Sequence, residues 1–331
     1  GSMSSTVLVT GAAGFIGSHL VEALLERGDT VLGCDLADAE KSHNLDLVRD
    51  HPQFHYTRLD IRDRDAVEAW YDPTASTVYH LASVVGVQHY LEDPLALVDI
   101  VVGGTRTMLA LAAEHHARFL FASTSEVFGR NPAIPWKEDA DRVLGATSVD
   151  RWSYSSSKGV CEHMIYGMAR VKGLEFTIVR PFNIYGPRQN PIYVVSQSVY
   201  RALRGEPPLL FDGGAQTRCF TYIADLVDGM ILAANSPLAV GEVFNLGNDR
   251  ERTIADAVRI TRQGTGMEDA ALDFDTVAEY GKVYEDIERR VPDVQKAREV
   301  LGWRAEVSLE EGIARTIEWA KQNPWYLADR N

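Results

Sequence analysis

The stretch T-V-L-V-T-G-A-A-G-F-I-G, residues 6–17, decides the fold. Its first part, Thr6–Thr10, is a short apolar run rich in β-branched residues, which predicts a buried strand. Glycines follow at positions 11, 14 and 17, and residues 18–28 then show a helical pattern that ends at Gly28. A strand, a glycine-rich turn and a helix in this order predict the start of a βαβ unit.

The same alternation of strand and helix continues along the chain. Further strands are predicted at Thr30–Asp35, His55–Asp60, Ser76–Ser83, Arg118–Thr124 and Glu175–Pro181. Helical patterns lie between them, for example at Asp99–His115 and Ser155–Lys172. Strands that alternate with helices imply a parallel sheet covered on both faces. The expected fold class is therefore α/β, with a Rossmann-type doubly wound parallel sheet and a smaller C-terminal α/β lobe.

The glycine-rich turn suits a dinucleotide. Gly11 permits the tight turn, Gly14 lets the backbone approach a diphosphate, and Gly17 lets the helix pack close to the strand. The helix N-terminus adds N–H groups and the positive end of a dipole. Asp35 ends the second strand and is placed to bind the ribose hydroxyls, and its charge repels a 2′-phosphate, so NAD is favoured over NADP. Glycines that serve an ordinary turn are the alternative interpretation.

Other cofactor contacts are expected where neighbouring strands end. Asp60 and Ile61 follow the third strand, within reach of an adenine amino group, although a helix N-cap is the alternative role for Asp60 and for Asp63. The predicted cofactor contacts are Gly11, Gly14, Phe15, Ile16, Gly17, Asp35, Asp60, Ile61, Leu81, Ala82, Tyr154 and Lys158.

Composition narrows the class of protein. A net charge of −14 argues against a nucleic-acid partner, and an anionic ligand would need local cations. No apolar run approaches the roughly 18 residues of a membrane span, so no membrane partner is expected. The three cysteines are widely spaced, without a pairing or metal motif, which predicts no metal site and favours a reducing compartment, the cytoplasm.

Tyr154 and Lys158 form the second chemical motif, Y-S-S-S-K. Their spacing places a phenol and an ammonium on one face of a helix. A tyrosine with a pKa of about 10 is a weak base at neutral pH, and a nearby lysine lowers that pKa by stabilising the phenolate. Thr124, at the end of the fourth strand, adds a hydroxyl. A surface pair is the alternative interpretation of Tyr154 and Lys158.

Together, G-A-A-G-F-I-G, S-T-S-E-V-F-G (residues 123–129), Y-S-S-S-K and R-P-F-N-I-Y-G-P-R (residues 180–188) resemble the extended short-chain dehydrogenase/reductase family, which acts on nucleotide sugars. The resemblance spans about residues 6–320. It implies that NAD stays bound, that Tyr154 and Thr124 remove the proton of the sugar C4 hydroxyl, and that hydride passes to the nicotinamide. The resulting 4-ketone is the intermediate from which epimerisation, dehydration or decarboxylation proceeds.

The resemblance also suggests a division of the chain and a quaternary structure. We expect an NAD-binding domain over residues 4–182, to which residues 217–247 return, and a nucleotide-sugar-binding lobe over residues 183–331. Helices 99–115 and 155–172 match those that form a four-helix dimer interface in the family, so a homodimer is expected.

Substrate residues follow from the same resemblance. The matching Asn183 and Arg218 contact the sugar and the nucleotide diphosphate in similar proteins, and a guanidinium suits a diphosphate. The run E-R-R-V-P-D-V-Q-K-A-R-E-V-L-G-W, residues 288–303, resembles the tail of UDP-glucuronate decarboxylases, in which an arginine matches Arg290. The predicted substrate contacts are Ser125, Arg151, Asn183, Arg218, Tyr284 and Arg290.

Ser125 and Glu126 distinguish the possible reactions. Dehydratases of this family carry Asp-Glu at these positions, 4-epimerases carry small neutral residues, and decarboxylases carry Ser-Glu, as here. We expect Glu126 to have a raised pKa in a partly desolvated site and to take part in proton transfer, with Arg290 as carboxylate ligand or proton donor. A carboxylate folded back on the following loop is the alternative. The predicted catalytic residues are Thr124, Glu126, Tyr154, Lys158 and Arg290.

The resulting prediction is an NAD-dependent UDP-glucuronate decarboxylase that forms a UDP-4-keto-pentose, UDP-xylose or both. The alternatives are a UDP-glucuronate 4-epimerase, another epimerase or reductase of nucleotide sugars, and a non-catalytic NAD sensor. Two positions depart from the family pattern: Val101 stands near a common Asn, and Tyr193 stands where many UDP-xylose synthases have an Arg.

Overall fold

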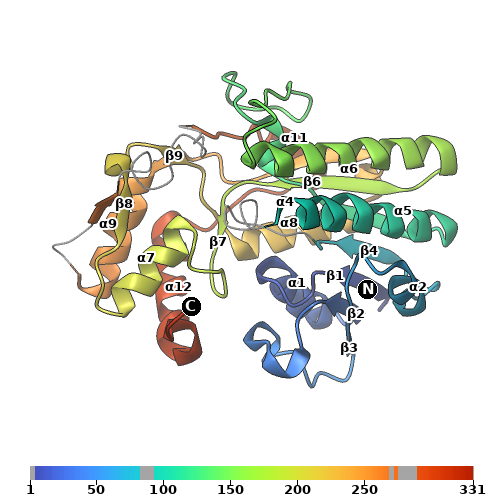
Figure 1. Cartoon of the computed structure of the whole chain (residues 1–331), viewed down its shortest axis with the longest axis horizontal. Helices are drawn as coiled ribbons and strands as arrows, with labels where there is room; N and C mark the ends of the chain where they lie inside the picture. Colours follow the sequence, from blue (N-terminus) through green and yellow to red (C-terminus); the bar gives the residue numbers. More distant parts are fainter. Residues whose placement is uncertain (1–3, 83–92, 268–271, 275–288, 331) are drawn as a thin grey trace.

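The computed structural model describes residues 4–82, 93–267, 272–274 and 289–330. Figure 1 shows a large sheet covered by helices, and beside it a smaller group of helices that contains α7, α9 and α12. The division into two domains stays a prediction, because the chain crosses between these two regions more than once.

The central sheet has seven parallel strands. They are β1 (Thr6–Thr10), β2 (Thr30–Asp35), β3 (Phe54–Arg58), β4 (Thr77–His80), β5 (Arg118–Ala122), β6 (Phe176–Pro181) and β11 (Glu242–Leu246). Their order across the sheet is β11-β6-β5-β4-β1-β2-β3, which confirms the predicted fold class. The order reverses between β1 and β4, and ligands of such sheets bind at the carboxyl ends of the strands at this point.

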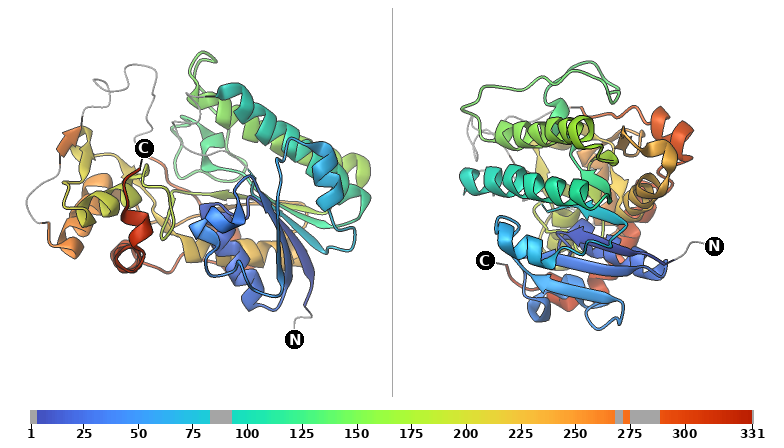
Figure 2. Two further views of the ribbon diagram at one scale, coloured as in Figure 1. Left: turned by 60° about the horizontal axis from the view of Figure 1, so that its bottom comes forward. Right: turned by 90° about the vertical axis from the view of Figure 1, so that its right-hand side faces the viewer.

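Two helical layers bury the two faces of the sheet. Val7 and Val9 belong to the core under α1 (Phe15–Glu26) and α8 (Ile223–Asn235), whereas Leu8 points to the opposite core. That second core lies under α2 (Arg64–Trp70), α4 (Pro94–Val98), the π-helical turn η3 (Asp99–Gly103), α5 (Gly104–Glu114) and α6 (Arg151–Lys172). Figure 2 shows α5 and α6 side by side along this face.

The remaining elements are the helices of the smaller lobe, α11 (Gln295–Leu301), which packs on β11 of the central sheet, and short strands and turns in both regions. The helices of the lobe are α7 (Val194–Leu203), α9 (Ile254–Thr265) and α12 (Leu309–Gln322). Short two-stranded sheets pair β7 (Ile184–Tyr185) with β10 (Thr221–Tyr222), β8 (Leu209–Phe211) with β13 (Leu272–Phe274), and β9 (Thr217–Arg218) with β12 (Arg252–Thr253). The 3₁₀ turns are η1 (Ala39–Lys41), η2 (His43–Leu45), η4 (Ser125–Phe128), η5 (Asp212–Gly214), η6 (Pro237–Ala239) and η8 (Pro324–Leu327).

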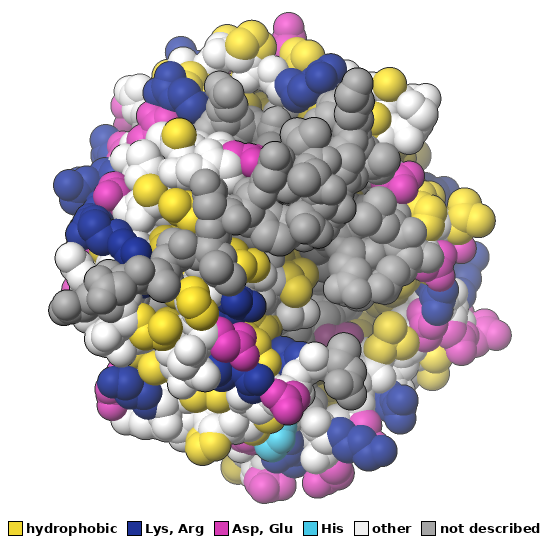
Figure 3. Space-filling view, turned by 60° about the vertical axis from the view of Figure 1, so that its left-hand side comes forward, with side chains coloured by type: hydrophobic (Ala, Val, Ile, Leu, Met, Phe, Trp, Pro, Cys, Tyr) yellow, Lys and Arg dark blue, Asp and Glu magenta, His cyan; other side chains and the backbone are white. Residues whose placement is uncertain are grey.

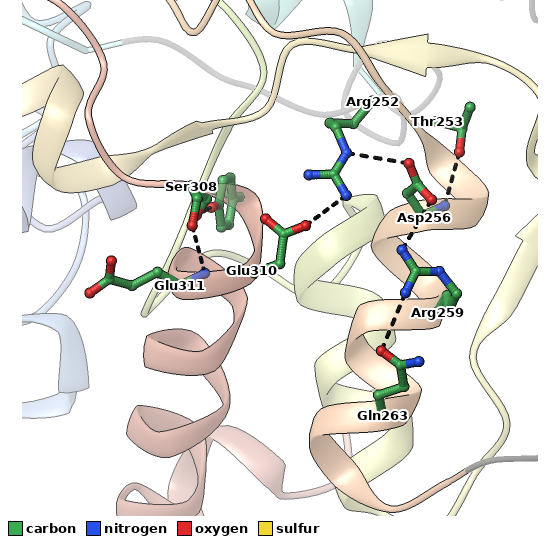
Figure 4. Close-up of polar contacts among 9 residues, drawn as sticks. Arg252, Thr253, Asp256, Arg259, Gln263, Ser308, Glu310 and Glu311 are labelled. Atoms are coloured by element: carbon green, nitrogen blue, oxygen red, sulfur yellow. Dashed lines mark hydrogen bonds and ion pairs between the residues drawn. The ribbon is translucent and has the colours of Figure 1, made fainter.

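An arginine links two helices of this lobe, as Figure 4 shows. The Arg252 guanidinium pairs with Asp256 on α9 at 3.3 Å and with Glu310 on α12 at 2.8 Å. Each helix is also capped, because Thr253 accepts from the Asp256 N–H and Ser308 from the Glu311 N–H. Hydroxyl caps therefore set where both helices begin.

Three local features differ from the sequence-based expectations. Helix α6 begins at Arg151 rather than Ser155, so Arg151 and Tyr154 lie on one rigid element. Strand β5 ends at Ala122, because the Thr124 side chain accepts a bond from the Glu126 N–H and starts a 3₁₀ turn. The continuous helix Pro94–Glu114 is apolar and long enough, by length and composition alone, to cross a membrane, which the sequence did not lead us to expect. Here it packs on α6 and the sheet, with 44% of its most apolar window buried.

Candidate active site

The glycine-rich turn requires glycine at two positions. Gly11 has φ of +71°, and a Cβ there would lie 3.1 Å from the backbone of Leu81 and of Ala82. A Cβ on Gly17 would lie 1.9 Å from the Gly11 carbonyl oxygen, so α1 approaches the turn as closely as the sequence predicted. The turn thus lies against the residues that follow β4, at the point where the strand order reverses.

We expect Gly17→Ala to lower the free energy of unfolding by about 1–3 kcal/mol, because the added methyl group must push the turn away from α1. The loss of NAD affinity should accompany the loss of stability. Gly167→Ala is the matched control, since Gly167 lies on α6 with no atom near its Cβ position. Urea denaturation measures both variants, and equal stability for the two would contradict the close approach.

Asp35 lies beside the glycine-rich turn. Its Oδ2 accepts from the Ala13 N–H at 3.1 Å and its Oδ1 from the Leu36 N–H at 2.7 Å, while burial raises its pKa. Asp60 is engaged differently, because Arg62 pairs with it at 2.7 Å and the bonds from Arg62 lower its pKa. Ile61 is buried and packs against Gly104 of α5. The structure therefore places the Asp35 carboxylate, and not that of Asp60, against the glycine-rich turn.

A buried polar chain that the sequence did not reveal supports the same turn. Thr10 Oγ1 accepts from the N–H groups of Leu81 and Ala82 at 3.0 and 3.1 Å. Its own proton is directed to His80 Nδ1 at 2.7 Å, so the Nε2 proton of His80 is donated to Thr105 Oγ1 at 3.0 Å. Burial, and then the charge of Lys158, lower the pKa of His80 to about 3, so this histidine is neutral. Thr10 and His80 were missed because each looks like an ordinary strand residue.

Tyr154 and Lys158 are brought together on α6 below the end of β5. Both side chains are buried, and the Lys158 ammonium lies 5.8 Å from the centre of the Tyr154 ring. Lys158 donates to the Ala122 carbonyl at 2.9 Å and lies 4.7 Å from the centre of the Phe121 ring. Burial lowers the pKa of Lys158 to about 8. A lysine whose pKa is lowered toward neutral pH and a phenol are thus held one helical turn apart on α6.

Glu126 lies between two buried arginines. Arg151 approaches both carboxylate oxygens, with Nη2–Oε1 at 3.0 Å and Nε–Oε2 at 3.3 Å, and Arg290 Nη2 donates to Oε1 at 2.5 Å. The exposed fractions of the three side chains are 17% for Glu126, 6% for Arg151 and 9% for Arg290. We call these three residues the arginine clamp.

The expected raised pKa of Glu126 is wrong. Burial acts to raise this pKa, but the charges of Arg290 and Arg151 and the bonds they donate outweigh it, and the pKa falls to about 2. Glu126 is therefore ionised at neutral pH and is no proton donor in this state. The error arose because the sequence showed a desolvated strand end without the two arginines that surround it.

Arg290 is brought to the clamp by backbone pairing between two segments that are distant in the sequence. Trp136 pairs with the segment around Pro292: its N–H donates to the Val291 carbonyl at 2.8 Å, and its carbonyl accepts from the Asp293 N–H at 2.8 Å. The Trp136 ring is fully buried in a small core with Phe128 and Phe182. This pairing brings Arg290 to Glu126 across 164 residues of sequence.

We expect Glu126→Gln to lower the free energy of unfolding by about 3 kcal/mol at pH 7, because two buried arginines lose their counter-charge. The difference from the wild type should shrink as the pH falls. The folded-state pKa of about 2 lies below the ordinary value of 4.5, so the stability from ionised Glu126 is complete above pH 4.5 and disappears toward pH 2. Denaturation curves at pH 7, 5, 4 and 3 check this, and a constant difference would contradict it.

The other predicted substrate residues lie on neighbouring segments. Ser125 is buried directly before Glu126. Asn183 has φ of +46°. Its buried Oδ1 has no hydrogen-bond partner among the described residues, so this oxygen beside β7 can accept a hydrogen bond from a ligand. Arg218 lies on β9 opposite Arg252 of β12, is buried, and donates to the Thr217 carbonyl at 2.8 Å. Tyr284 lies outside the described residues.

The two positions that depart from the family pattern have identifiable surroundings. Tyr193 is half-buried at the start of α7, and burial together with the charge of Glu126 raises its pKa to about 12. It therefore lies near the arginine clamp. Val101 lies in the π-helical turn η3, where its carbonyl accepts from the Cys161 thiol at 3.3 Å.

Comparison with known proteins identifies the family of this chain. A family model described as GDP-mannose 4,6 dehydratase matches residues 8–316. The chain belongs to the extended short-chain dehydrogenase/reductase family. Members of this family are NAD-dependent decarboxylases, epimerases or dehydratases of nucleotide sugars, so this extended dehydrogenase/reductase is an NAD-dependent enzyme.

Individual relatives carry more specific names. A UDP-N-acetyl-alpha-D-glucosaminuronate decarboxylase of Bacillus cytotoxicus is 36% identical, over 97% of this chain and 99% of its own. A UDP-glucuronic acid decarboxylase 1 of Xenopus tropicalis is 35% identical, over 96% of this chain and 72% of its own. The UDP-glucuronic acid 4-epimerase of Bacillus cereus, solved with UDP-glucuronic acid and NAD, is 28% identical with a TM-score of 0.83, over 96% of this chain and 99% of that one.

The residues that would hold NAD fit the cofactor. The turn at Gly11 and Gly17 leaves no space for a Cβ, and the carboxylate of Asp35 lies within hydrogen-bond distance of the turn backbone. Such a turn at a helix N-terminus accommodates a diphosphate, and a carboxylate beside it accommodates a ribose.

Proposed function

We propose that this enzyme decarboxylates UDP-glucuronate, with a UDP-4-keto-pentose, UDP-xylose or both as products. The observation that carries the proposal is the arginine clamp, in which two buried guanidinium groups share one carboxylate.

The charges of the clamp do not cancel. Two arginines and one ionised glutamate carry a net charge of +1 among these three side chains, and burying a net charge is costly. A second carboxylate would neutralise it and could be held by an arginine fork. On the face shown in Figure 3, the exposed Lys and Arg side chains that are described are interspersed with Asp and Glu. The clamp is therefore the site that we propose for a uronate carboxylate.

The order of the chemical steps follows from the positions of the residues. NAD, when bound, would accept a hydride from the C4 carbon, and its reduced form would return the hydride where UDP-xylose is the product. Tyr154, beside the Lys158 ammonium, would take the proton of the C4 hydroxyl. The C4 ketone is then β to the C6 carboxylate, so the C5–C6 bond can break with its electron pair moving into the C4–C5 enolate and carbon dioxide leaving. A proton delivered to C5 from the side of Arg290 completes the step.

The names of the relatives support decarboxylation of a uronate but differ in its 2-substituent. The relative from Bacillus cytotoxicus is named for an N-acetylated uronate and the one from Xenopus tropicalis for glucuronate. The second candidate function is 4-epimerisation of UDP-glucuronate, which the name of the Bacillus cereus structure supports. Both reactions begin with C4 oxidation at Tyr154, and they differ in whether the carboxylate is lost.

Mass spectrometry of the products tests the proposal. Purified enzyme with NAD is incubated with UDP-glucuronate, with UDP-N-acetylglucosaminuronate, and with UDP-glucose, which lacks the carboxylate. The proposal requires a loss from UDP-glucuronate of about 44 mass units, the mass of carbon dioxide, where UDP-xylose forms, or of about 46 where the UDP-4-keto-pentose is released, because that product has also given two hydrogens to the oxidation step. Loss of carbon dioxide only from UDP-N-acetylglucosaminuronate would mean that this sugar, and not UDP-glucuronate, is the substrate. A product of unchanged mass that is inverted at C4 would mean that the enzyme is an epimerase and not a decarboxylase.

We also propose that the enzyme is a homodimer formed through α4, α5 and α6. Large apolar side chains are exposed on α4, which leads into α5, and on α6: Leu95 (77%), Val98 (37%), Val160 (45%) and Val171 (74%). We expect Val160→Glu to convert the dimer to a monomer in sedimentation velocity, because a buried charge would oppose association. Val240→Glu, on an apolar residue outside these helices, is the control. A monomeric wild type would contradict the proposal.

A further inference from the structure

The segment between β7 and α7, residues 186–193, connects two parts of the site. It is preceded by Asn183 and ends at Tyr193, which lies near the arginine clamp. The backbone in and just before this segment has positive φ angles: +46° at Asn183, +149° at Gly186 and +77° at Arg188. Positive φ at Asn183 and Arg188 is unfavourable, so surrounding contacts must hold the segment in place.

Those contacts come from α1, the helix that begins at the glycine-rich turn. Arg188 forms an ion pair with Glu22 and donates to Ser18 Oγ at 3.3 Å, with only 7% of its side chain exposed. His19 Nε2 lies 2.7 Å from the Pro187 carbonyl. Because burial and the Arg188 charge lower the pKa of His19 to about 4, the neutral ring donates this bond. These bonds join positions more than 165 residues apart in the chain.

A second anchor holds the other side of the segment. The Tyr326 hydroxyl, in the C-terminal turn η8, donates to the Gln189 carbonyl at 2.6 Å, and Tyr326 is 1% exposed. Gln189 in turn donates from Nε2 to the Ile184 carbonyl at 2.8 Å. The segment is thus fixed at consecutive residues, Pro187 and Arg188 to α1 and Gln189 to η8.

We propose that Arg188 is a positioning residue, which sets the segment between Asn183 and Tyr193 in register with the cofactor-binding helix α1. NAD binds the state in which the glycine-rich turn and α1 are ordered, so it makes openings that disrupt α1 rarer. The segment shares this protection through Arg188, Glu22 and the bond from His19. Binding of NAD therefore stabilises the sugar-side segment before any substrate is present.

Hydrogen exchange of the full chain, with and without NAD, tests this. In the wild type, NAD should slow exchange in α1 and also in peptides covering residues 184–200. In Arg188→Ala and Glu22→Gln, slowing should persist in α1 but fall at least about tenfold in peptides 184–200. Arg188→Lys, which keeps the charge but loses the planar fork, should give an intermediate result. Glu68→Gln, which removes an exposed ion pair on α2, should behave as wild type.

Two results would overturn the proposal: no effect of NAD on peptides 184–200 in the wild type, or an equal effect in Arg188→Ala, Glu22→Gln and the wild type. Glu22→Gln keeps the packing of Arg188, so it remains informative if Arg188→Ala unfolds. Turnover adds a second readout that rests on the proposed function. With UDP-glucuronate, kcat should fall by roughly tenfold or more in both variants while the Kd for NAD changes by less than about threefold. A wild type without turnover would reject the proposed function and leave the exchange experiment to decide the role of Arg188.

Discussion

Tyr154→Phe is expected to abolish C4 oxidation while the fold and NAD binding are retained. The phenol hydroxyl is the group that we propose takes the C4 proton, and the removal of a general base lowers rates by about 10²- to 10⁴-fold. The substitution deletes one oxygen from a buried ring on α6, so the helix and the Lys158 contacts to Ala122 and Phe121 should remain. Absorbance of NADH on mixing with UDP-glucuronate measures the step directly.

Tyr166→Phe is the matched control for this variant. Tyr166 lies on the same helix, is 39% exposed and packs edge-on against Phe176. Its loss of a hydroxyl should leave NADH formation unchanged. If Tyr154→Phe forms NADH as fast as Tyr166→Phe, the base is another group and the mechanism proposed for this helix is wrong.

Arg290→Gln is expected to separate C4 oxidation from loss of carbon dioxide. The variant leaves Glu126 paired with Arg151, so the clamp becomes neutral and no longer favours a second carboxylate. Removing one charged donor from a catalytic site costs on the order of 10²- to 10³-fold. Carbon dioxide release should fall by this factor, whereas NADH formation in a single turnover should change far less. Trapped ¹⁴C-labelled carbon dioxide and NADH absorbance measure the two steps.

Arg289→Gln is the matched control, because Arg289 is the neighbouring residue, is 57% exposed and pairs with Glu251 at 2.6 Å. It should leave the ratio of the two steps unchanged. Binding of UDP-glucose adds a test of specificity, since it lacks the carboxylate and its affinity should be the same in Arg290→Gln and the wild type. Equal losses in oxidation and decarboxylation would mean that Arg290 only maintains the shape of the site.

Much of the fold could be predicted because local patterns specify it. Strands at Thr6–Thr10 and Thr30–Asp35 were predicted with the bounds the structure has, since apolar β-branched runs bounded by turn residues leave little freedom. The requirement for glycine at position 17 was also visible, and the structure shows its cause in the distance to the Gly11 carbonyl. The helix that carries Tyr154 was predicted to begin four residues late, because helix starts depend on contacts outside the local pattern.

The chemistry of Glu126 could not be predicted in the same way. A pKa is the balance of burial and neighbouring charge, and the sequence indicated burial only. The two arginines that reverse the shift lie 25 and 164 residues away. The same holds for Arg188, whose partners on α1 are 166 and 170 residues distant.

The sequence by itself thus determined a parallel α/β sheet, a glycine-rich turn after its first strand and a Tyr–Lys pair one helical turn apart, since each depends on residues a few positions from one another. The tertiary structure alone decided that Trp136 pairs with the segment at Pro292 and that Arg290 therefore meets Glu126. Contacts between residues that are distant in the sequence produce no periodic pattern by which they could be predicted. The net charge of a buried site depends on such contacts.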